Sequence, residues 1–540
     1  MSSVARELVL TGPMGAGKSS VGRLVARWLG ARFDDLDELV EAREGISIQR
    51  LFERGEERFR RAETRALHAW MADSAIETRV LALGGGSLVE PGLAEAVSAR
   101  ATLVHLDAPA EGLLARLTPQ ARAARPLLTS AVDPLARLEQ IRCERVAGYE
   151  EALLRIDTAV RDLPGVALEL LRRLYASGGP WEAHSEMLSG ERFASGSVSF
   201  GRGGLPFPPS ARATLLWDST LPAVHRDLLI PELRALAGGQ LLCLERIGGE
   251  DAKTPESLVG AWEELLAAGV DKDVPLWVTG GGTLMDLGGL LAQTFKRGLD
   301  CALLPTTLLA QVDAGLGGKN GINLAGAKNV VGTIRLPQQV HLDVLFLLSL
   351  AEDDLRCGLS EAIKSALIAD PKLIDLIESR ADDLFMRSLP LLEEVTRRAA
   401  RVKLRIIARD LDESGERRQL NLGHTLGHAL ETLRGRRGRP LRHGDAVATG
   451  LVFAARLARS RGELEEPDLV ERLEELLARL GLPVALPHLA GDERQELLDL
   501  LRHDKKRRGG ENLWVLPHRA GTVRVQAVPP EEVAAELAVW

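Results

Sequence analysis

The stretch ELVLTGPMGAGKSS, residues 7–20, decides how the first part of the chain folds. A short apolar run, Glu7–Thr11, leads through a glycine turn into Ser19–Leu29, where apolar residues recur at helical spacing. The turn, Gly12–Ser19, matches G-x-x-x-x-G-K-[ST] between a predicted strand and a predicted helix, which is the context that this phosphate-binding motif requires. The sequence therefore predicts a nucleotide-binding α/β unit.

The residue types in this turn suit a nucleoside triphosphate with its metal ion. Glycines let backbone N–H groups curl around the phosphates, a lysine adds a positive charge, and a hydroxyl can bind Mg²⁺. We therefore expect ATP with Mg²⁺ as the first cofactor, although the motif does not define the phosphate acceptor. The expected nucleotide-binding residues here are Gly12, Gly15, Gly17, Lys18, Ser19 and Ser20.

Strands and helices alternate through the rest of this region. Further strands are predicted at Val80–Leu83 and Thr102–Leu106, and a helix at Val166–Tyr175. This alternation favours a parallel sheet with helices on both faces. The stretch Ala176–Pro209 is rich in Gly, Ser and Pro, as in a linker. We expect a first domain over residues 1–175 and a linker over 176–194.

The remainder of the chain changes character near residue 346. Buried strands separated by helical segments are predicted at Thr214–Asp218, Gln240–Glu245 and Pro275–Thr279. From Ala351 the pattern is almost wholly helical until Asn512–Val515. We expect a second α/β domain over residues 195–345 and a mainly helical domain over 346–540.

Length and composition limit the possible partners. A chain of 540 residues exceeds the size of one hydrophobic core, and a formal charge of −8 gives no global reason to bind nucleic acid or an anionic membrane. No apolar run reaches membrane-spanning length, and no signal-peptide pattern opens the chain. Four cysteines without C-x-x-C spacing favour reduced thiols. We expect a cytoplasmic protein with small-molecule partners, no nucleic acid and no membrane.

Over roughly residues 1–172 the chain resembles shikimate kinase. Phe33–Asp37 is like F-x-D-x-D, and Gly55–Glu63 fits G-E-x-x-F-R-x-x-E. Gly84–Gly86 follows a strand, Arg125–Leu128 fits a lid motif, and Arg145 stands four residues before a tyrosine. Several motifs in the right order are far more specific than the phosphate-binding turn alone.

The resemblance implies a role for each of these residues. Arginines would grip the substrate carboxylate and an aspartate would orient or deprotonate a ring hydroxyl. Arg125 would stabilise the transferring phosphoryl group and Asp35 would support Mg²⁺ through water. The runner-up acceptor is another small polyol, as in gluconate-type kinases. The implied residues are Asp37 as base, and Arg60, Arg145, Gly84, Gly85 and Gly86 around the carboxylate.

Residues 361–443 contain the residue types that bind a metal ion. Glu361 and Lys364 are three apart and His424 and His428 four apart in helical patterns, so each pair projects from one helix face. With His443 after a loop, two histidines and one glutamate make a three-ligand site that leaves a position open for substrate, as in catalytic zinc centres. The sequence predicts Zn²⁺, or Co²⁺, at this site.

A second nucleotide feature lies upstream of the metal site. Gly280-Gly281-Gly282 follows the apolar strand Leu276–Thr279 and precedes Asp286 in a predicted helix, as in dinucleotide-binding turns. The turn is not G-x-G-x-x-G and is weak evidence by itself.

From about residue 195 to the C-terminus the chain resembles 3-dehydroquinate synthase. Matching blocks occur in the order and with most of the spacings of that family. They are Gly248–Glu250 with Lys253, Gly280–Asp286, Pro305–Asp313, Gly317–Lys319, Gly326–Asn329, Gly358–Lys364, Arg417–His428, His443–Asp445 and Asp504–Lys506.

The resemblance implies conversion of 3-deoxy-D-arabino-heptulosonate 7-phosphate to 3-dehydroquinate and phosphate, with NAD⁺ as a recycled hydride acceptor. The metal held by Glu361, His424 and His443 would polarise the C5 oxygen, with His428 as proton shuttle and Asp313 as relay. Catalytic roles also fall to Lys319 and Lys364. The implied substrate-binding residues are Arg297, Lys319, Lys328, Asn329, Lys364, Lys403, Arg417, Asn421 and Lys505, with Lys506 as an alternative to the last.

The same resemblance implies an NAD site. Asp218 would meet ribose, Glu250 and Lys253 the adenosine end, and Asp286 the nicotinamide side. The implied cofactor-binding residues are Asp218, Glu250, Lys253, Gly281, Gly282, Asp286, Thr306, Thr307, Lys319 and Lys328.

Three positions depart from the family pattern. Met285 stands where a small residue is usual, and we expect its bulk beside the cofactor. Gly315 replaces a common serine. Asp445 replaces a glutamate next to His443, which would shorten a carboxylate that we expect to support that ligand.

Taken together, the sequence predicts a bifunctional α/β enzyme of the shikimate pathway, with a P-loop kinase domain, an NAD-binding α/β domain and a mainly helical metal domain. The resemblance also implies a homodimer. Alternatives stay open: the C-terminal half as another sugar phosphate cyclase or a polyol dehydrogenase, or one half as a non-catalytic module. Because a substrate carboxylate gives Arg417 and Lys403 a purpose, they argue mildly against cyclases of glucose 6-phosphate or sedoheptulose 7-phosphate.

Overall fold

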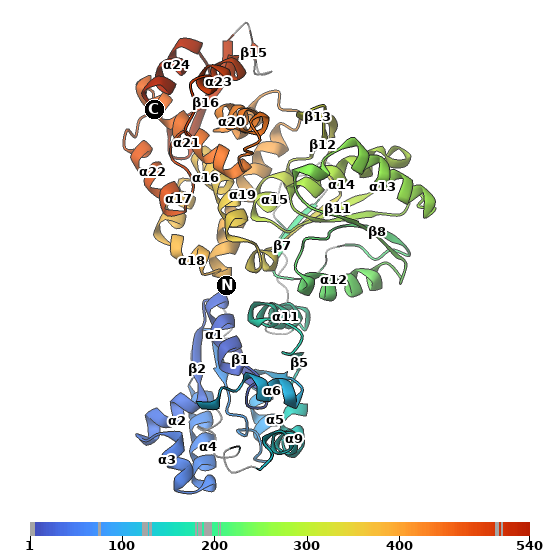
Figure 1. Ribbon diagram of the computed structural model, residues 1–540, viewed down its shortest axis with the longest axis vertical. Helices are drawn as coiled ribbons and strands as arrows, with labels where there is room; N and C mark the ends of the chain where they lie inside the picture. Colours follow the sequence, from blue (N-terminus) through green and yellow to red (C-terminus); the bar gives the residue numbers. More distant parts are fainter. Residues whose placement is uncertain are drawn as a thin grey trace. The chain divides into compact units, whose positions relative to one another are not determined.

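A computed structural model describes most of the chain, which forms two compact units (Figure 1). One unit comprises Met1–Ala183, and the other comprises most of the remaining chain, His184–Phe385 and Leu391–Trp540. The described residues are 6–73, 77–120, 128, 132–178, 181, 186–187, 197–203, 205, 207–502, 507–508 and 511–540.

The first unit is built on a five-stranded sheet in which all neighbouring strands are parallel. The strand order is β2-β3-β1-β4-β5, so β1 is central and its five residues are all buried. The strands are β1 (Glu7–Thr11), β2 (Arg32–Asp35), β3 (Arg79–Ala82), β4 (Thr102–Asp107) and β5 (Leu154–Asp157).

Helices cover both faces of this sheet because side chains alternate along each strand. Val9 packs into an apolar cluster with Leu36, Phe59 and Trp70 of the helices on one face. Leu10 faces α1 on the other side, where a Cβ at Gly22 would lie 3.3 Å from its Cδ1 atom. The helices are α1 (Lys18–Leu29), α2 (Leu36–Glu44), α3 (Ile48–Glu53), α4 (Glu56–Ala72), α5 (Leu93–Ser98), α6 (Ala110–Arg116), α9 (Pro134–Glu144), α10 (Val146–Glu150) and α11 (Leu163–Ala176).

The second unit begins with a seven-stranded sheet of order β6-β7-β14-β11-β10-β8-β9. All its pairs are parallel except β6 with β7. The strands are β6 (Glu186–Met187), β7 (Ser197–Gly201), β8 (Ala213–Asp218), β9 (Leu241–Arg246), β10 (Leu276–Gly280), β11 (Cys301–Pro305) and β14 (Gln339–Asp343).

Helices accompany this sheet, and an antiparallel hairpin extends from it (Figure 1). The hairpin consists of β12 (Lys319–Leu324) and β13 (Ala327–Ile334). The helical elements are α12 (Ala223–Leu236), η2 (Glu250–Ala252), α13 (Pro255–Ala267), α14 (Gly282–Thr294), η3 (Phe295–Arg297), α15 (Leu308–Val312), η4 (Ala314–Leu316) and η5 (Val344–Leu348).

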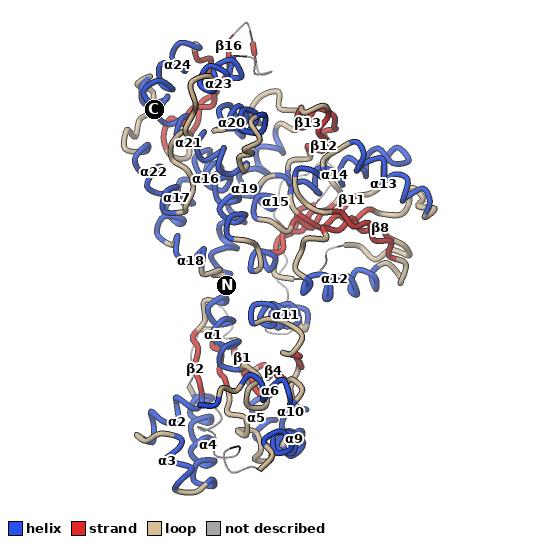
Figure 2. Tube along the Cα trace, in the orientation of Figure 1, coloured by secondary structure: helices blue, strands red, loops and turns tan. Residues whose placement is uncertain are grey.

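The last third of the chain is mainly helical, as the predominance of blue in that part of Figure 2 shows. A small antiparallel sheet of β15 (Arg507–Arg508), β16 (Glu511–Arg519) and β17 (Thr522–Val528) lies near its end. The helices are α16 (Glu352–Ala369), α17 (Pro371–Ser379), α18 (Ala381–Phe385), α19 (Leu389–Arg409), η6 (Glu416–Asn421), α20 (His424–Arg436), α21 (His443–Ser460), α22 (Leu469–Arg479), α23 (Glu493–Arg502) and α24 (Pro530–Val539).

The predicted fold class is confirmed, and all the strands predicted before residue 300 are present within one or two residues. The structure adds elements that the sequence patterns missed, chiefly β2, β5 and the β12–β13 hairpin. The described parts of the expected linker, 176–194, make contacts with the folded units. Trp181 is buried and its indole N–H donates to the Thr102 hydroxyl at 2.9 Å, while Glu186–Met187 pairs with β7.

Among the residues that the structure describes, no helix is long and apolar enough to cross a membrane.

Candidate active sites

The glycine turn Gly12–Ser19 connects β1 to α1 in a conformation that only small residues allow. Gly12 has φ 138°, and a Cβ there would clash with the Leu106 carbonyl of β4. Gly17, with φ 86°, is the N-cap of α1. The Lys18 ammonium donates to the Gly12 and Pro13 carbonyls at 2.8 and 3.0 Å. The loop therefore combines a helix N-terminus with a lysine, which suits phosphate.

Two oxygen ligands suitable for Mg²⁺ lie next to this loop. The Ser19 hydroxyl donates to Asp35 at 2.6 Å, at the junction of β2 and α2. Asp35 also caps α2 by accepting from the Asp37 N–H at 3.1 Å. Hydroxyl and carboxylate oxygens are hard ligands of the kind that Mg²⁺ prefers.

The Gly84–Gly86 turn after β3 gathers the expected acceptor-site residues. A Cβ at Gly86 would lie 2.7 Å from the Arg60 guanidinium, and one at Gly84 would lie 3.2 Å from Asp37 Oδ1. Arg145 donates to the Gly85 carbonyl at 2.7 Å. Two arginines, a carboxylate and a small-residue turn thus meet beside the phosphate loop, as binding of a hydroxy acid requires.

Its surroundings make Asp37 more basic than an ordinary aspartate. Its side chain is exposed, but partial burial of the carboxyl group and the charges of Asp35 and Glu63 raise the pKa of Asp37 to about 6. Burial, with Arg60 nearby, lowers the pKa of Arg145.

Two supporting residues had no assigned role from the sequence. Glu63 is buried, accepts from Arg60 at 2.5 Å and from Ser87 at 2.7 Å, and so fixes the arginine. Tyr149 donates to the Gly85 carbonyl at 2.9 Å, beside Arg145. The sequence did contain signals for both residues. Glu63 is the final glutamate of the G-E-x-x-F-R-x-x-E motif, and Tyr149 is the tyrosine that follows Arg145. The expected lid residue Arg125 lies outside the described residues, as do Lys505 and Lys506.

In the second unit, the sheet has a topological switch point between β8 and β10. The chain leaves β8 for β9 on one side and returns to β10 on the other, which opens a crevice at the carboxyl ends of these strands. Asp218 ends β8 there, and a Cβ at Gly280 would lie 3.1 Å from its Cβ. Gly282 begins α14, and Thr307 lies against Gly281. The crevice brings together the residues expected to hold a dinucleotide.

Lys253 and Asp286 lie together in this crevice. The Lys253 ammonium donates to Asp286 at 2.7 Å and also contacts the Asn329 side-chain oxygen. Burial raises the pKa of Asp286 to about 6 although Lys253 opposes this. The predicted contacts of Lys253 with the adenosine end and of Asp286 with the nicotinamide side stay predictions, and the ion pair shows that both side chains lie at the same part of the crevice. Glu250 lies apart, where it accepts from Asn323 at 2.8 Å.

Three side chains from three helices converge as the candidate metal ligands. Glu361 Oε1 lies 3.5 Å from His424 Nε2 and 3.3 Å from His443 Nε2. The candidate ligand atoms all lie within 4.8 Å of one another. Among the described residues, neither oxygen of the buried Glu361 carboxylate has a hydrogen bond of regular geometry, although Lys364 lies at ion-pair distance.

This donor set fits a divalent cation such as Zn²⁺. His424 Nδ1 lies 3.0 Å from the Leu422 carbonyl, an arrangement that leaves Nε2 free to bind a metal. Burial would lower the pKa of His443, but Glu361 and Glu431 raise it to about 10. The cluster therefore attracts positive charge, and two imidazoles with one carboxylate are a donor set typical of open zinc sites.

Two further residues lie beside the ligands. The His428 ring centroid is 5.1 Å from that of His424, and His428 is exposed, in keeping with a proton shuttle. Glu431, which sequence reasoning missed, places Oε2 3.6 Å from His443 Nδ1. Burial would raise the pKa of Glu431, but His443 and Lys328 lower it to about 2. The carboxylate that supports His443 is thus Glu431, and not Asp445 as expected, because α20 and α21 pack side by side.

A buried charge cluster adjoins the metal site. Asp313, at the end of α15, contacts Lys403 and lies 3.5 Å from Lys364. Lys364 also contacts Glu361, so the lysine joins both carboxylates. Burial opposes ionisation of Asp313, but Lys403 and Lys364 hold its pKa well below its usual value. Burial lowers the pKa of Lys403.

The other expected anion-binding residues surround this cluster. Glu413 contacts Lys319 and accepts from Asn421 at 2.6 Å, so it is a further site residue that sequence reasoning missed. Arg417 is buried and donates to the Gly317 carbonyl at 2.6 Å. Lys328 donates to Glu431 at 3.0 Å.

Arg297 is not brought to this site within its own chain. It follows α14, whose 13 residues carry the chain about 20 Å away from the glycine turn, to the amino-terminal end of β11. Its side chain is exposed. The predicted role of Arg297 in substrate binding stays a prediction, since α14 separates this residue from the carboxyl ends of the strands in its own chain.

The structure shows the surroundings of two of the residues that depart from the family pattern. A Cβ at Gly315 would lie 2.8 Å from the Ala310 carbonyl, so a serine there requires the loop to shift. Met285 is 1% exposed, so it does not line the open side of the crevice as expected.

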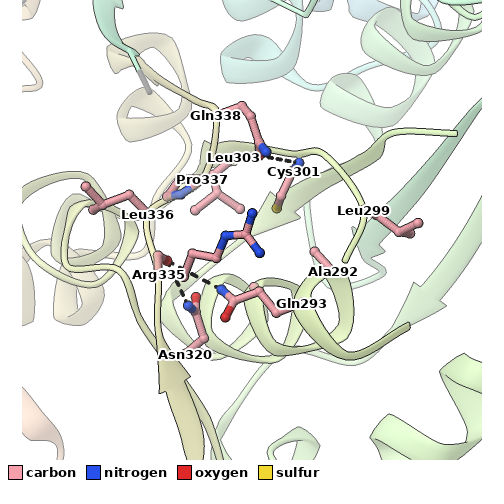
Figure 3. Close-up of a pocket in the computed structure, with 11 residues that line it drawn as sticks. Ala292, Gln293, Leu299, Cys301, Leu303, Asn320, Arg335, Leu336, Pro337 and Gln338 are labelled. Carbon is pink, nitrogen blue, oxygen red and sulfur yellow. Dashed lines mark hydrogen bonds between the residues drawn. The ribbon is translucent and has the colours of Figure 1, made fainter. Parts of the chain in front are cut away.

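A small cavity lies near the amino-terminal end of β11 (Figure 3). The Cys301 N–H donates to Gln338 at 2.7 Å, and the Arg335 carbonyl accepts from Asn320 at 3.0 Å. Its volume of about 10 Å³ is about that of one water molecule. It is too small for a nucleotide or a sugar phosphate, so it is not one of the candidate active sites.

Comparison with protein families agrees with the division of the chain into two units that each have a candidate site. The shikimate kinase family model matches residues 14–175. The models of the 3-dehydroquinate synthase N-terminal and C-terminal domains match residues 244–357 and 358–507.

Individual relatives extend the agreement. The chain is 32% identical over 504 residues to the bifunctional shikimate kinase/3-dehydroquinate synthase of Thermotoga maritima, covering 92% of this chain and 93% of that protein. It is 37% identical over 329 residues to the 2-epi-valiolone synthase of Actinosynnema mirum, covering 60% of this chain and 85% of that protein.

A solved structure is similar over the second unit. The 2-epi-5-epi-valiolone synthase ValA of Streptomyces hygroscopicus, with NAD⁺ and Zn²⁺ bound, superposes with a TM-score of 0.57 at 29% identity, covering 65% of this chain and 98% of that one. The long match to the Thermotoga protein, together with both sets of domain models, shows that the chain belongs to the family of bifunctional shikimate kinase/3-dehydroquinate synthases and joins a kinase to a lyase of the shikimate pathway.

Proposed function

We propose that the first unit phosphorylates shikimate with ATP and Mg²⁺ through the residues gathered at its phosphate loop. Lys18 and the loop N–H groups hold the phosphates, and Ser19 with Asp35 holds Mg²⁺. This proposal is supported by the proximity of these groups to the Gly84–Gly86 turn.

Asp37 is the proposed general base of this reaction. Its raised pKa makes it a better proton acceptor than an ordinary aspartate, and it lies beside the turn that receives the substrate ring. Arg60 and Arg145 bind the substrate carboxylate. Arg125 completes the site as a lid residue, a role that rests on the family resemblance alone.

We propose that the second unit converts 3-deoxy-D-arabino-heptulosonate 7-phosphate to 3-dehydroquinate and phosphate. The observation that carries this proposal is the convergence of Glu361, His424 and His443 within 4.8 Å, next to a cluster of buried lysines. A bound Zn²⁺ or Co²⁺ would polarise the substrate oxygen, and bound NAD⁺ would accept and return the hydride.

The chain's own residues bind the anionic substrate and move its protons. Lys364 and Lys403 place buried positive charge beside the ligands, and Asp313 holds both ammonium groups in place. Lys319, Asn421 and Arg417 extend this binding surface, and His428 is positioned to transfer a proton at its open side. NAD⁺ binding falls to the crevice between β8 and β10, with Lys253 and Asp286 at one end of it.

One assay tests both proposals on purified full-length protein. Incubation with 3-deoxy-D-arabino-heptulosonate 7-phosphate should release one phosphate per carbocycle without net NADH, and ATP with shikimate should give shikimate 3-phosphate. Accumulation of NADH at each turnover would instead support a polyol dehydrogenase.

A second candidate for this unit is a cyclase of another sugar phosphate, which the 37% identity to a 2-epi-valiolone synthase favours. The chemical difference is the substrate carboxylate, for which the buried Arg417 and Lys403 offer partners. Turnover of sedoheptulose 7-phosphate in preference to the heptulosonate would establish this candidate.

We further propose a cytoplasmic location, supported by the four free cysteines, and a homodimer formed through the second unit. Size-exclusion chromatography with light scattering tests the oligomeric state.

A further inference from the structure

The buried carboxylate of Glu431 faces two different nitrogen groups, an imidazole and an ammonium. Its Oε2 atom lies 3.6 Å from His443 Nδ1, and its Oε1 atom accepts from the Lys328 ammonium at 3.0 Å. The side chain of Glu431 is 7% exposed. Since a buried carboxylate is costly unless it is paired, this arrangement depends on both partners.

The contact with His443 determines which ring nitrogen can bind a metal. His443 Nε2 points to Glu361, while Nδ1 points to Glu431. A carboxylate beside Nδ1 favours the proton on that atom and leaves the Nε2 lone pair for the cation, as in the carboxylate–histidine–metal arrangement.

The contact with Lys328 extends from the metal site to the hairpin β12–β13. The next residue, Asn329, has φ 50° and contacts Lys253, which is paired with Asp286 in the dinucleotide crevice. Among these contacts, the Glu431–Lys328 pair connects α20, the helix that carries His424, to the hairpin.

We propose that Glu431 is a positioning residue that sets the metal-binding orientation of His443 and, through Lys328, holds the hairpin in the position that NAD⁺ binding requires. This inference rests on the proposed metal site of the second unit. It assigns to Glu431 the role that the sequence suggested for Asp445.

The first test measures metal affinity directly. Full-length protein stripped of metal is titrated with Co²⁺ or Zn²⁺ alone, against a chromophoric chelator, without substrate. The variant Glu431→Gln should bind 10- to 100-fold more weakly than the parent, and Glu431→Asp should recover part of the loss. Circular dichroism and thermal unfolding of the same samples report whether the second unit remains folded.

Asp445→Asn is the matched control, because this carboxylate is two residues from His443 in the first turn of α21 but is not the group beside Nδ1. Its metal affinity should equal that of the parent. A loss for Asp445→Asn and none for Glu431→Gln would overturn the proposal. So would the binding of a second metal ion that depends on Glu431, since Glu431 would then be a ligand with His428 and His443.

The second test measures coupling to the dinucleotide crevice. Glu431→Gln and Lys328→Met should each weaken NAD⁺ binding several-fold, and the double variant should lose no more than either one, because both break the same contact. Fully additive losses would contradict the coupling. If the parent itself binds no metal, or if His424→Ala leaves metal affinity unchanged, the proposed metal site fails and the role of Glu431 fails with it; a loss for His424→Ala with none for Glu431→Gln refutes the role of Glu431 alone.

Discussion

His443 Nε2 lies 3.3 Å from Glu361 Oε1, although the two side chains come from the first residue of α21 and the middle of α16. Their proximity depends on the packing of α16 against α21, which also receives α20 with His424. The relative positions of the candidate metal ligands therefore depend on how closely these three helices pack.

Glycines set the closest of those contacts. A Cβ at Gly450 of α21 would clash with the carbonyl of Gly423, the N-cap of α20 that directly precedes His424. We predict that Gly450→Ala displaces α20, lowers the stability of the second unit by about 1–3 kcal/mol and weakens metal binding. Thermal unfolding and metal titration measure these effects.

The matched control for this substitution is Gly435→Ala, near the end of α20. A Cβ there meets nothing within 4 Å, and alanine is the better helix former, so this variant should be unchanged or more stable by about 0.5–1 kcal/mol. Equal destabilisation by both variants would show that the clash is not the cause.

The two activities should separate by mutation. Lys18→Ala removes the charge at the phosphate loop and should abolish shikimate phosphorylation while sparing cyclisation. His424→Ala removes a metal ligand and should do the opposite. Both products are measured on each purified variant, and loss of both activities from a folded protein would contradict the two-site division.

Kinase activity should depend on pH through Asp37. Its pKa is raised to about 6, so the carboxylate is mostly ionised at pH 7 and becomes protonated as the pH falls through 6. A protonated carboxyl group cannot accept the hydroxyl proton, so kcat/KM should fall about tenfold per pH unit below 6. An inflection near 4, the range of an ordinary aspartate, would exclude this role. Asp37→Asn should show little activity at any pH.

Metal removal should affect only the second reaction. A zinc-selective chelator in the presence of excess Mg²⁺ should abolish phosphate release from the heptulosonate phosphate, because the ligands Glu361, His424 and His443 then hold no Lewis acid. Shikimate phosphorylation should continue, since the ion proposed for that reaction is Mg²⁺ at Ser19 and Asp35, which remains in excess. Readdition of Zn²⁺ or Co²⁺ should restore the lost activity, and chelator-resistant cyclisation would argue against a catalytic metal.

The sequence alone determined the features that reside in short segments. The phosphate loop is one, because the Gly12–Ser19 conformation depends on glycines and a lysine within a single turn. The amphipathic helices that carry Glu361 with Lys364, and His424 with His428, are others, because helical spacing fixes which side chains share a face.

Tertiary structure alone decided which segments meet. It placed Glu431, rather than Asp445, beside His443, brought Lys253 to Asp286, and left Arg297 at the far end of α14. The physical reason is that these relationships depend on helix packing and strand order, which bring together groups from separate segments, whereas a sequence motif records only spacing along one segment.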